Sequence, residues 1–288
     1  MTGGTLLLPE RGKGCFSSLS TIDPSALLGP ERTRRLDPLS QFALLATERA
    51  RRTALLPRQS SVEIREREGV VVGTAFGATV TSVRYAKRLV KAGPAGTNPI
   101  DFPDSIDGAA AAHVALDLGL QGPSLTFVDG RDSAASALVV GARLIATGRA
   151  ERVHVVAGDV LDEVFQRALT SDVGIEFGDA VAAWVLERAE LRPAVQGTVA
   201  IDGLTSAFGV RDDGSGLAKE HSYFGGQADP AGVLDVAGAW LQARGPMGSA
   251  DDPWQPDGMT DFDGAPAEAP IPNGTYRALR FRPVVARR

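Results

Sequence analysis

Apolar positions along the chain fall into two alternating patterns, which together predict an α/β fold. Short continuous apolar runs predict strands buried on both faces, and longer amphipathic or largely apolar stretches predict helices. Strands are expected at 68–73, 124–128, 153–158, 180–186 and 198–201, and helices at 39–52, 81–92, 106–118, 133–147 and 230–244. Strands that alternate with helices of this length predict a mixed sheet with helices on its faces.

Residues at the ends of these segments support the predicted helices. Asp37 followed by Pro38 is typical of an N-cap with proline at the first helical position. The helix at 106–118 is rich in alanine and is followed by Gly119, a residue that commonly ends helices. The helix at 133–147 is apolar on nearly all faces, so we expect it to lie centrally.

The regularity of the pattern divides the chain into three parts. Residues 1–20 are expected to form a loose N-terminal segment, and residues 21–205 form the regular body. In residues 206–288 the pattern weakens, which predicts a degenerate, shortened C-terminal half. Within it, 245–273 is rich in Gly, Pro, Asp and Ala and is expected to be an extended or partly disordered loop. A final edge strand is expected at 276–285.

Composition narrows the class of protein. Hydrophobic residues make up 43% and charged residues 23% of the 288 residues, as in ordinary soluble proteins. A net charge of −5 gives no electrostatic support for binding nucleic acid or an anionic membrane. The one cysteine, Cys15, cannot form an intramolecular disulfide, and no apolar run reaches the length of about 18 residues that a membrane span needs. These features predict a cytoplasmic protein.

Common catalytic motifs are absent from the sequence. There is no glycine-rich dinucleotide motif, Walker loop, H-E-x-x-H, G-x-S-x-G or paired C-x-x-C, so we expect no cofactor and no metal. The three histidines are the possible bases. His113 and His154 lie in core elements and are expected to be structural, whereas His221 lies in a probable loop, where it is either solvated or available as a base.

Several stretches, in the same order, resemble the β-ketoacyl-ACP synthases. The run Arg34-Arg35-Leu36-Asp37-Pro38, continuing to Leu44, is similar to a segment that opens a helix in the N-terminal half of these enzymes. Further similar stretches are 22–28, 70–74, 119–123, 142–145, 156–158, 178–182 and 186–187. The resemblance covers roughly residues 20–205, and it implies a thiolase-like fold whose second half is truncated.

In active members of this family, the nucleophilic cysteine stands at the start of the helix that here begins near Ser133. A helix N-terminus stabilises the negative charge of a thiolate. The resemblance places Asp132 at this position, and a carboxylate is a weak nucleophile toward a thioester. Asp132 is also interpreted as the N-cap of the helix. The two catalytic histidines of the family's second half have no counterpart here, so no catalytic residue is expected.

Subunits of this family without a nucleophile are the chain-length factors of type II polyketide systems. The resemblance therefore implies a non-catalytic subunit that forms a heterodimer with an active β-ketoacyl synthase, and that meets acyl carrier protein through the synthase. The residues implied to line the acyl tunnel or the dimer interface are Phe102, Ile106, Ala109, Ala110 and His113. Small alanine side chains would leave room for a longer acyl chain; the alternative is ordinary core packing.

Two other functions remain open. The chain is alternatively a stand-alone or homodimeric acyl-binding or scaffold protein. It is alternatively an enzyme in which Asp132 or His221 performs other acid–base chemistry on an acyl thioester. A shortened second half would leave apolar surface without intramolecular cover, and such surface favours a partner.

Overall fold

The computed structural model describes residues 3–7, 19, 22–58, 60–173, 177–191, 199–209, 223–224, 227–228, 233 and 274–283. His221, Cys15 and the expected loop at 245–273 lie outside the described residues, as does the expected helix at 230–244 apart from Val233.

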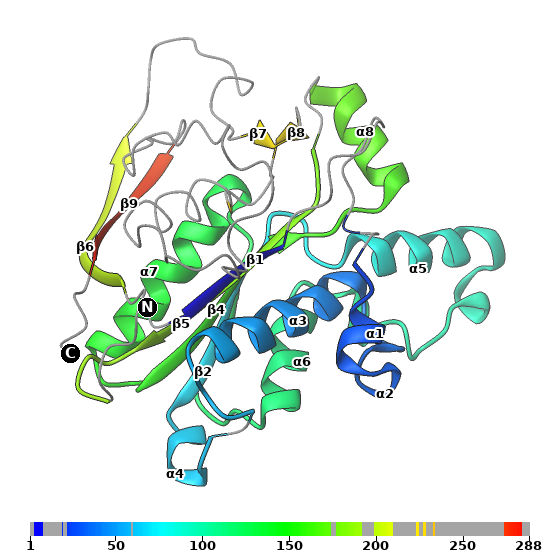
Figure 1. The fold of residues 1–288 in the computed structure, drawn as a ribbon. Helices are drawn as coiled ribbons and strands as arrows, with labels where there is room; N and C mark the ends of the chain where they lie inside the picture. Colours follow the sequence, from blue (N-terminus) through cyan, green and yellow to red (C-terminus); the bar gives the residue numbers. More distant parts are fainter. Residues whose placement is uncertain are drawn as a thin grey trace.

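The order of elements follows the expected alternation of strands and helices (Figure 1). The α-helices are α1 Pro24–Leu28, α2 Pro30–Thr33, α3 Pro38–Thr53, α4 Val62–Arg65, α5 Thr79–Ala92, α6 Ala109–Leu118, α7 Ser133–Ala146 and α8 Glu163–Val173. The strands are β1 Gly3–Leu7, β2 Glu68–Gly73, β3 Ser124–Phe127, β4 Arg152–Asp159, β5 Ala180–Glu187, β6 Val199–Gly209, β7 Tyr223–Phe224, β8 Gln227–Ala228 and β9 Gly274–Pro283. Short 3-10 helices are η2 Pro94–Gly96, η3 Pro103–Ser105 and η4 Gly130–Asp132.

A mixed five-stranded sheet forms the centre, with strand order β1-β5-β4-β2-β3. Strand β2 runs parallel to β3 and β4, while β5 runs antiparallel to β4 and β1. This confirms the predicted mixed sheet. Strand β1 lies within residues 1–20, where no strand was expected. Its five residues carry no alternating pattern, and its partner β5 is distant in sequence, so the sequence pattern does not predict it. Strands β6 and β9 form a separate antiparallel ribbon, so the strand expected at 276–285 is present.

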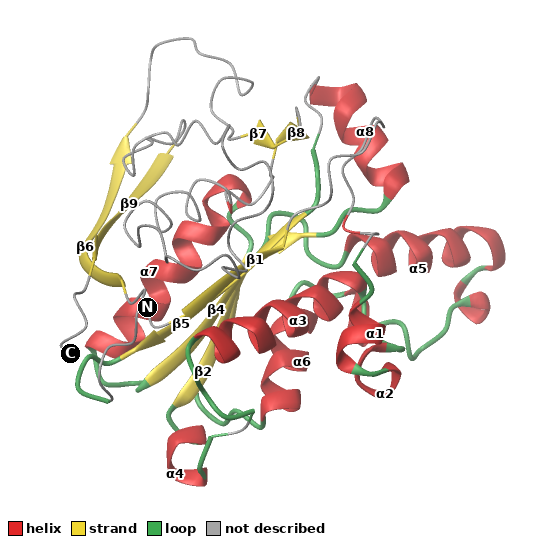
Figure 2. Cartoon of the chain, viewed as in Figure 1, coloured by secondary structure: helices red, strands yellow, loops and turns green. Residues whose placement is uncertain are grey.

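Helices cover both faces of the sheet (Figure 2). Helices α3 and α6 contact each other and lie on one face, where α3 packs on β1, β5 and β4 and α6 packs on β2. Helix α7 lies on the opposite face against β4 and β2, and β9 contacts the same helix. The expectation that α7 is central is confirmed.

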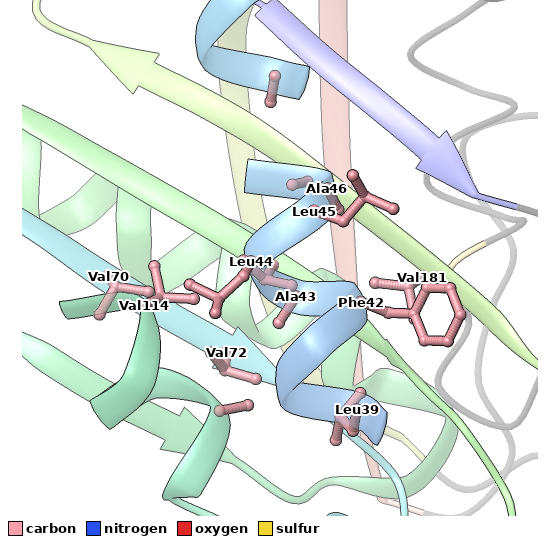
Figure 3. Packing of buried hydrophobic residues seen from close by; sticks show 14 of the residues in the cluster. Leu39, Phe42, Ala43, Leu44, Leu45, Ala46, Val70, Val72, Val114 and Val181 are labelled. Carbon is pink, nitrogen blue, oxygen red and sulfur yellow. The ribbon is translucent and has the colours of Figure 1, made fainter. Parts of the chain in front are cut away.

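The strands alternate their side chains between these two helical layers. Along β5, Ala182 and Trp184 belong to the core cluster around α7. Their neighbours Ala183 and Val185 belong to the cluster around α3 and α6, which Figure 3 shows from close by. Every residue of β2 and β4 is buried. Both faces of these strands are therefore shielded from solvent, which explains why their sequences contain continuous apolar runs.

The start of α3 confirms the predicted cap. An oxygen of the Asp37 side chain accepts a hydrogen bond from Leu39 N–H at 2.8 Å, and Pro38 occupies the first turn. The other oxygen accepts from Thr81 N–H at 3.0 Å, in the first turn of α5. Burial raises the pKa of Asp37, and these hydrogen bonds oppose that rise. One side chain thus caps α3 and joins it to α5.

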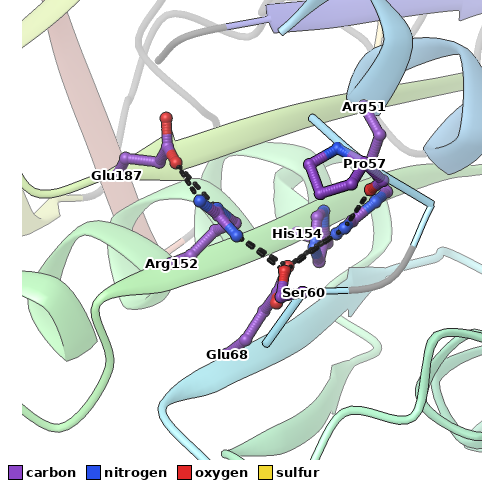
Figure 4. A network of polar contacts seen from close by, with 7 residues as sticks. All are labelled: Arg51, Pro57, Ser60, Glu68, Arg152, His154 and Glu187. Carbon is purple, nitrogen blue, oxygen red and sulfur yellow. Dashed lines mark hydrogen bonds and ion pairs between the residues drawn. The ribbon is translucent and has the colours of Figure 1, made fainter. Parts of the chain in front are cut away.

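A buried network of charged groups lies where β2 and β4 begin (Figure 4). Glu68 Oε1 accepts hydrogen bonds from Arg51 Nη1 and His154 Nε2, both at 2.6 Å. Arg152 continues the network, with Nη1 3.5 Å from the same oxygen of Glu68 and Nη2 2.6 Å from Glu187. The side chains of Glu68 and His154 are almost completely buried. The network therefore links α3, β2, β4 and β5 inside the protein.

The charges in this network are set by its geometry. Burial alone would raise the pKa of Glu68, but the hydrogen bonds from His154 and Ser60 and the charge of Arg51 outweigh it and hold the pKa well below its usual value. Burial lowers the pKa of His154, so the imidazole stays neutral. The burial of His154 and its contact with Glu68 agree with the predicted structural role, although its partner is a carboxylate and not a carbonyl group.

We expect Glu68→Gln to destabilise the protein by about 3 kcal/mol or more, because it removes the negative charge that compensates two buried guanidinium groups. The free energy of unfolding from urea denaturation is the measurement. The matched control is Glu163→Gln, whose ion pair with Arg167 is largely exposed and is expected to contribute less than about 1 kcal/mol. Equal effects of the two substitutions would contradict this account of the network.

Candidate functional site

The candidate site lies where β3 leads into α7. After β3 the chain turns through η4, with Gly130 in the left-handed region at φ +57°, and α7 begins at Ser133. Asp132 occupies the N-cap position, as expected. The prediction that its side chain caps the helix with a hydrogen bond is wrong, however. Asp132 has helical backbone angles of φ −84° and ψ −4° and makes no side-chain cap bond to α7, since capping side chains need an extended backbone at this position.

Other side chains hold the first turn of α7. Ser133 Oγ accepts from Asp129 N–H at 3.0 Å and lies 2.8 Å from the carbonyl oxygen of Thr74. Ser136 Oγ donates to Asp129 Oδ2 at 2.6 Å. Both serines are fully buried. Asp129 and the two serines therefore fix the turn that presents Asp132.

The end of β2 touches this turn directly. A Cβ atom at Gly73 would lie 2.2 Å from the carbonyl oxygen of Ser133, which is closer than any real contact. Only glycine fits at this position. The glycine that ends the apolar run 68–73 therefore determines how closely α7 approaches the sheet.

Asp159, at the end of β4, organises the loop that follows β2. Its side chain accepts hydrogen bonds from Thr74 Oγ1 at 2.6 Å and from the N–H groups of Ala75 and Phe76, both at 2.9 Å. Burial, assisted by the nearby charge of Asp179, raises the pKa of Asp159 to about 7, although these three hydrogen bonds oppose the rise. A buried carboxyl group that titrates near neutrality thus lies beside the first turn of α7.

Asp179 plays a similar part before β5. Its two oxygens accept from Leu19 N–H at 3.0 Å and Leu161 N–H at 2.9 Å. Sequence reasoning did not select either acid as a site residue. Each directly follows a glycine at a strand boundary, in Gly158-Asp159 and Gly178-Asp179, and that repeated pair was the available signal. Their hydrogen-bond partners come from distant segments, so the sequence alone does not reveal them.

Three phenylalanine rings pack together near these acids. The ring of Phe76 lies 5.2 Å from that of Phe165 and 6.3 Å from that of Phe177, in edge-to-face arrangements.

Within the described part of the chain, no group of three or more His, Cys, Asp or Glu residues is arranged to hold a metal ion. In that same part, no helix is long and apolar enough to cross a bilayer.

The five residues expected at a tunnel or interface divide into two groups. Phe102 and Ile106 are 58% and 50% exposed, whereas Ala109 and Ala110 are buried. His113 is partly exposed, and its Nε2 lies 2.5 Å from a carboxylate oxygen of Asp104 in η3. This hydrogen bond supports a structural part for His113. The tunnel role of these residues stays a prediction.

Strand β3 forms one edge of the five-stranded sheet. It pairs with β2 on one side, and within the described residues no strand pairs with its other side. Leu125 is 39% exposed and Val128, just after the strand, is 46% exposed. An apolar, exposed edge of this kind is a template for pairing with another chain.

Comparison with known proteins identifies the family. The family model described as "Beta-ketoacyl synthase, N-terminal domain" matches residues 9–171, more than half of the chain. The chain belongs to the β-ketoacyl synthase family. The matched residues include β2, α6 and the start of α7, so the resemblance of the sequence to β-ketoacyl-ACP synthases is confirmed.

Curated relatives align over shorter stretches. The chain is 31% identical over 110 residues to 3-oxoacyl-[acyl-carrier-protein] synthase I, chloroplastic, of Arabidopsis thaliana, covering 38% of this chain and 22% of that protein. It is 28% identical over 131 residues to 3-oxoacyl-[acyl-carrier-protein] synthase 2 of Rhizobium meliloti (strain 1021), covering 46% of this chain and 31% of that protein. The chain thus matches less than a third of the length of these relatives.

Solved structures show the same fold at low sequence identity. The ishigamide ketosynthase/chain length factor has a TM-score of 0.61 and 21% identity, over 74% of this chain and 68% of that one. A structure of AntDE:AntF, described as a type II PKS acyl-carrier protein in complex with its ketosynthase bound to the hexaketide, has a TM-score of 0.64 and 20% identity, over 72% of this chain and 68% of that one. The thiolase-like fold of this β-ketoacyl synthase family member is therefore established.

The raised pKa of Asp159 predicts a dependence of stability on pH. Its carboxyl group keeps its proton up to about pH 7 when folded, whereas the unfolded chain releases the proton near the ordinary pKa of 3.8. Folding therefore takes up a proton between these values, and the contribution of Asp159 to stability falls as the pH rises through this window, by at most about 1.4 kcal/mol per unit.

The test is urea denaturation from pH 5 to about pH 8. The difference in unfolding free energy between Asp159→Asn and the wild type should shift in favour of the variant as the pH rises, because asparagine does not ionise. Glu190→Gln, at an exposed position, is the control and should follow the wild type at every pH. If the difference in unfolding free energy between Asp159→Asn and the wild type did not change with pH, Asp159 would be ionised over the whole measured range, which would contradict the raised pKa.

Proposed function

We propose that this chain is a non-catalytic, chain-length-factor-like subunit that pairs with an active β-ketoacyl synthase in the cytoplasm and helps to shape its acyl tunnel. The proposal rests on Asp132 at the start of α7, the position that the resemblance implies for the cysteine nucleophile of active members. Condensation needs a thiolate that attacks the acyl thioester, and a carboxylate would form only a labile anhydride.

The rest of the sequence supports this assignment. Cys15 is the one cysteine in the chain, and it precedes α1 by several residues, far along the sequence from the start of α7. A chain without the cysteine nucleophile would act through its shape and its contacts, and it would depend on a partner for catalysis.

The exposed edge of the sheet supports pairing with a synthase. Leu125 and Val128 are apolar and exposed at the edge strand, and Phe102 and Ile106 are exposed in the segment before α6. An obligate interface commonly buries more than about 2,000 Å² in total and has an apolar centre. One neighbour in fold is described as a ketosynthase/chain length factor and another as a ketosynthase in complex with acyl carrier protein. The kind of partner proposed here is therefore found among proteins with this fold.

The proposed tunnel contribution comes from residues 102–110, which run from just before η3 into the first turn of α6. Ile106 and Phe102 are exposed in the isolated chain and would face the partner, whereas Ala109 and Ala110 are buried at the base of the same segment. Small side chains at the start of α6 would leave space for an acyl chain between the subunits. His113 would hold this segment in place through its contact with Asp104. In this proposal acyl carrier protein reaches the pair through the synthase.

The first test is co-expression with the ketosynthase encoded beside this chain, followed by size-exclusion chromatography with light scattering. We expect a 1:1 complex. Leu125→Asp should abolish it, because a buried charge at the pairing edge would be uncompensated. Val164→Asp, at an exposed apolar position on α8, is the matched control and should leave the complex intact. A monodisperse wild-type homodimer that does not bind the synthase would instead favour a homodimeric acyl-binding or scaffold protein.

The second test measures products of the complex. Ile106→Phe should shorten the polyketide product, because the added ring volume would block the end of the tunnel. Asp132→Ala in the same complex should leave both product length and turnover within about twofold of the wild type, since the synthase's own cysteine carries the condensation. Loss of turnover in Asp132→Ala would contradict a non-catalytic role and favour acid–base chemistry by this residue.

A further inference from the structure

Helix α8 is attached to the rest of the protein through a small apolar cluster. Leu161 and Phe177 form its buried centre, and Phe76, Phe165 and Leu169 pack against them. The cluster is distinct from the two larger ones on either side of the central sheet. Within the described part of the chain, no other helix or strand packs extensively on α8, and Figure 1 shows it apart from α3, α6 and α7. The small cluster is therefore the main apolar attachment of α8 among the described residues.

One residue joins this cluster to the larger core. The ring of Phe76 packs edge-to-face against the rings of Phe165 and Phe177, and the same side chain packs on the cluster around α7. Phe76 lies in the loop that follows β2, and its N–H group donates to Asp159 at the end of β4. The central sheet thus fixes the position of this ring, and the ring holds α8.

Polar contacts attach α8 toward its start. Thr79 Oγ1 donates to the carbonyl oxygen of Val160 at 3.0 Å and accepts a hydrogen bond from Asp162 N–H at 3.2 Å. In the first half of the helix, Gln166 Nε2 donates to the carbonyl oxygen of Phe177 at 2.6 Å. The segment that leads into α8 is therefore tied to the first turn of α5, as the fixed end of a hinge would be.

The length of α8 makes it dependent on these contacts. A helix of 11 residues has little stability of its own in water. Because Phe76 alone is shared with the cluster around α7, the larger clusters can stay packed when the small one separates. We propose that α8 is a lid that opens as a unit, with residues 160–162 as its hinge and Phe76 as its latch. Segments with few buried apolar contacts commonly open in this way.

Opening of the lid changes which groups the solvent reaches. Leu161 and Phe177 are each 7% exposed with α8 in place, and both lose cover when it swings away. The uncovered surface includes the loop after β2, where the Thr74 carbonyl oxygen lies 2.8 Å from Ser133 Oγ at the start of α7. The lid thus controls access to apolar surface beside the candidate site. The inference goes beyond the proposed function and holds whether or not the chain pairs with a synthase.

The test is hydrogen exchange of the full chain, followed by mass spectrometry of peptides from α8 and from the middle of α3. After correction for intrinsic rates, the amides of α8 should exchange at least about tenfold faster than those of α3. Low concentrations of urea should accelerate α8 less than α3, because a local opening exposes less surface than global unfolding. Phe76→Ala should speed exchange in α8 by about tenfold more, because the latch ring is removed.

The matched control is Tyr85→Ala, which removes a partly buried aromatic ring from α5 that does not belong to the small cluster. It should leave exchange in α8 within about twofold of the wild type. Phe165→Ala removes the same ring contact from the side of the lid, and it should reproduce the effect of Phe76→Ala even if that variant does not fold. Equal effects of Phe76→Ala and Tyr85→Ala would overturn the proposal. Exchange of wild-type α8 at the rate and with the urea dependence of α3 would overturn it as well.

Discussion

The contact between the end of β2 and the first turn of α7 determines the geometry of the candidate site. No side chain fits between Gly73 and the carbonyl oxygen of Ser133, so the helix rests directly on the sheet. The hydroxyl of Ser133 then reaches the carbonyl oxygen of Thr74, and the Thr74 hydroxyl reaches Asp159. The loops after β2 and β4 and the start of α7 are thereby joined through short polar contacts. If α7 moved away from the sheet, the contact between Ser133 and Thr74 would be lost.

The opposite ends of the same strands are held by a different kind of interaction. There Glu68 lies between Arg51 and His154, away from solvent. A buried ion pair of this kind contributes little net stability compared with a well-packed apolar core, but it tolerates very few alternative arrangements. The central sheet is thus fixed at one end by close packing and neutral hydrogen bonds and at the other by compensated charges. Between the two ends, apolar side chains pack on α3 and α7.

Much of the fold could be predicted from the sequence, because burial on both faces of β2 and β4 produces continuous apolar runs, and because Asp37 and Pro38 mark the start of α3 locally. Strand β1 could not, since it is short and its pairing with β5 is distant in sequence. Within the site, the position of Asp132 at the helix start was predictable from the resemblance. Its missing cap bond was not, because the preceding turn η4 gives it helical backbone angles. The roles of Asp159 and Asp179 could not be predicted, because their hydrogen-bond partners come together only in the folded chain.

The manner in which α7 begins bears on how this family diverges. Asp129, Ser133 and Ser136 hold the first turn, and the backbone at position 132 is already helical without a cap bond from its side chain. These contacts are therefore made by residues other than Asp132. In evolutionary terms, the frame of the turn and the group at the helix start are encoded by different codons, so selection acts on the two separately.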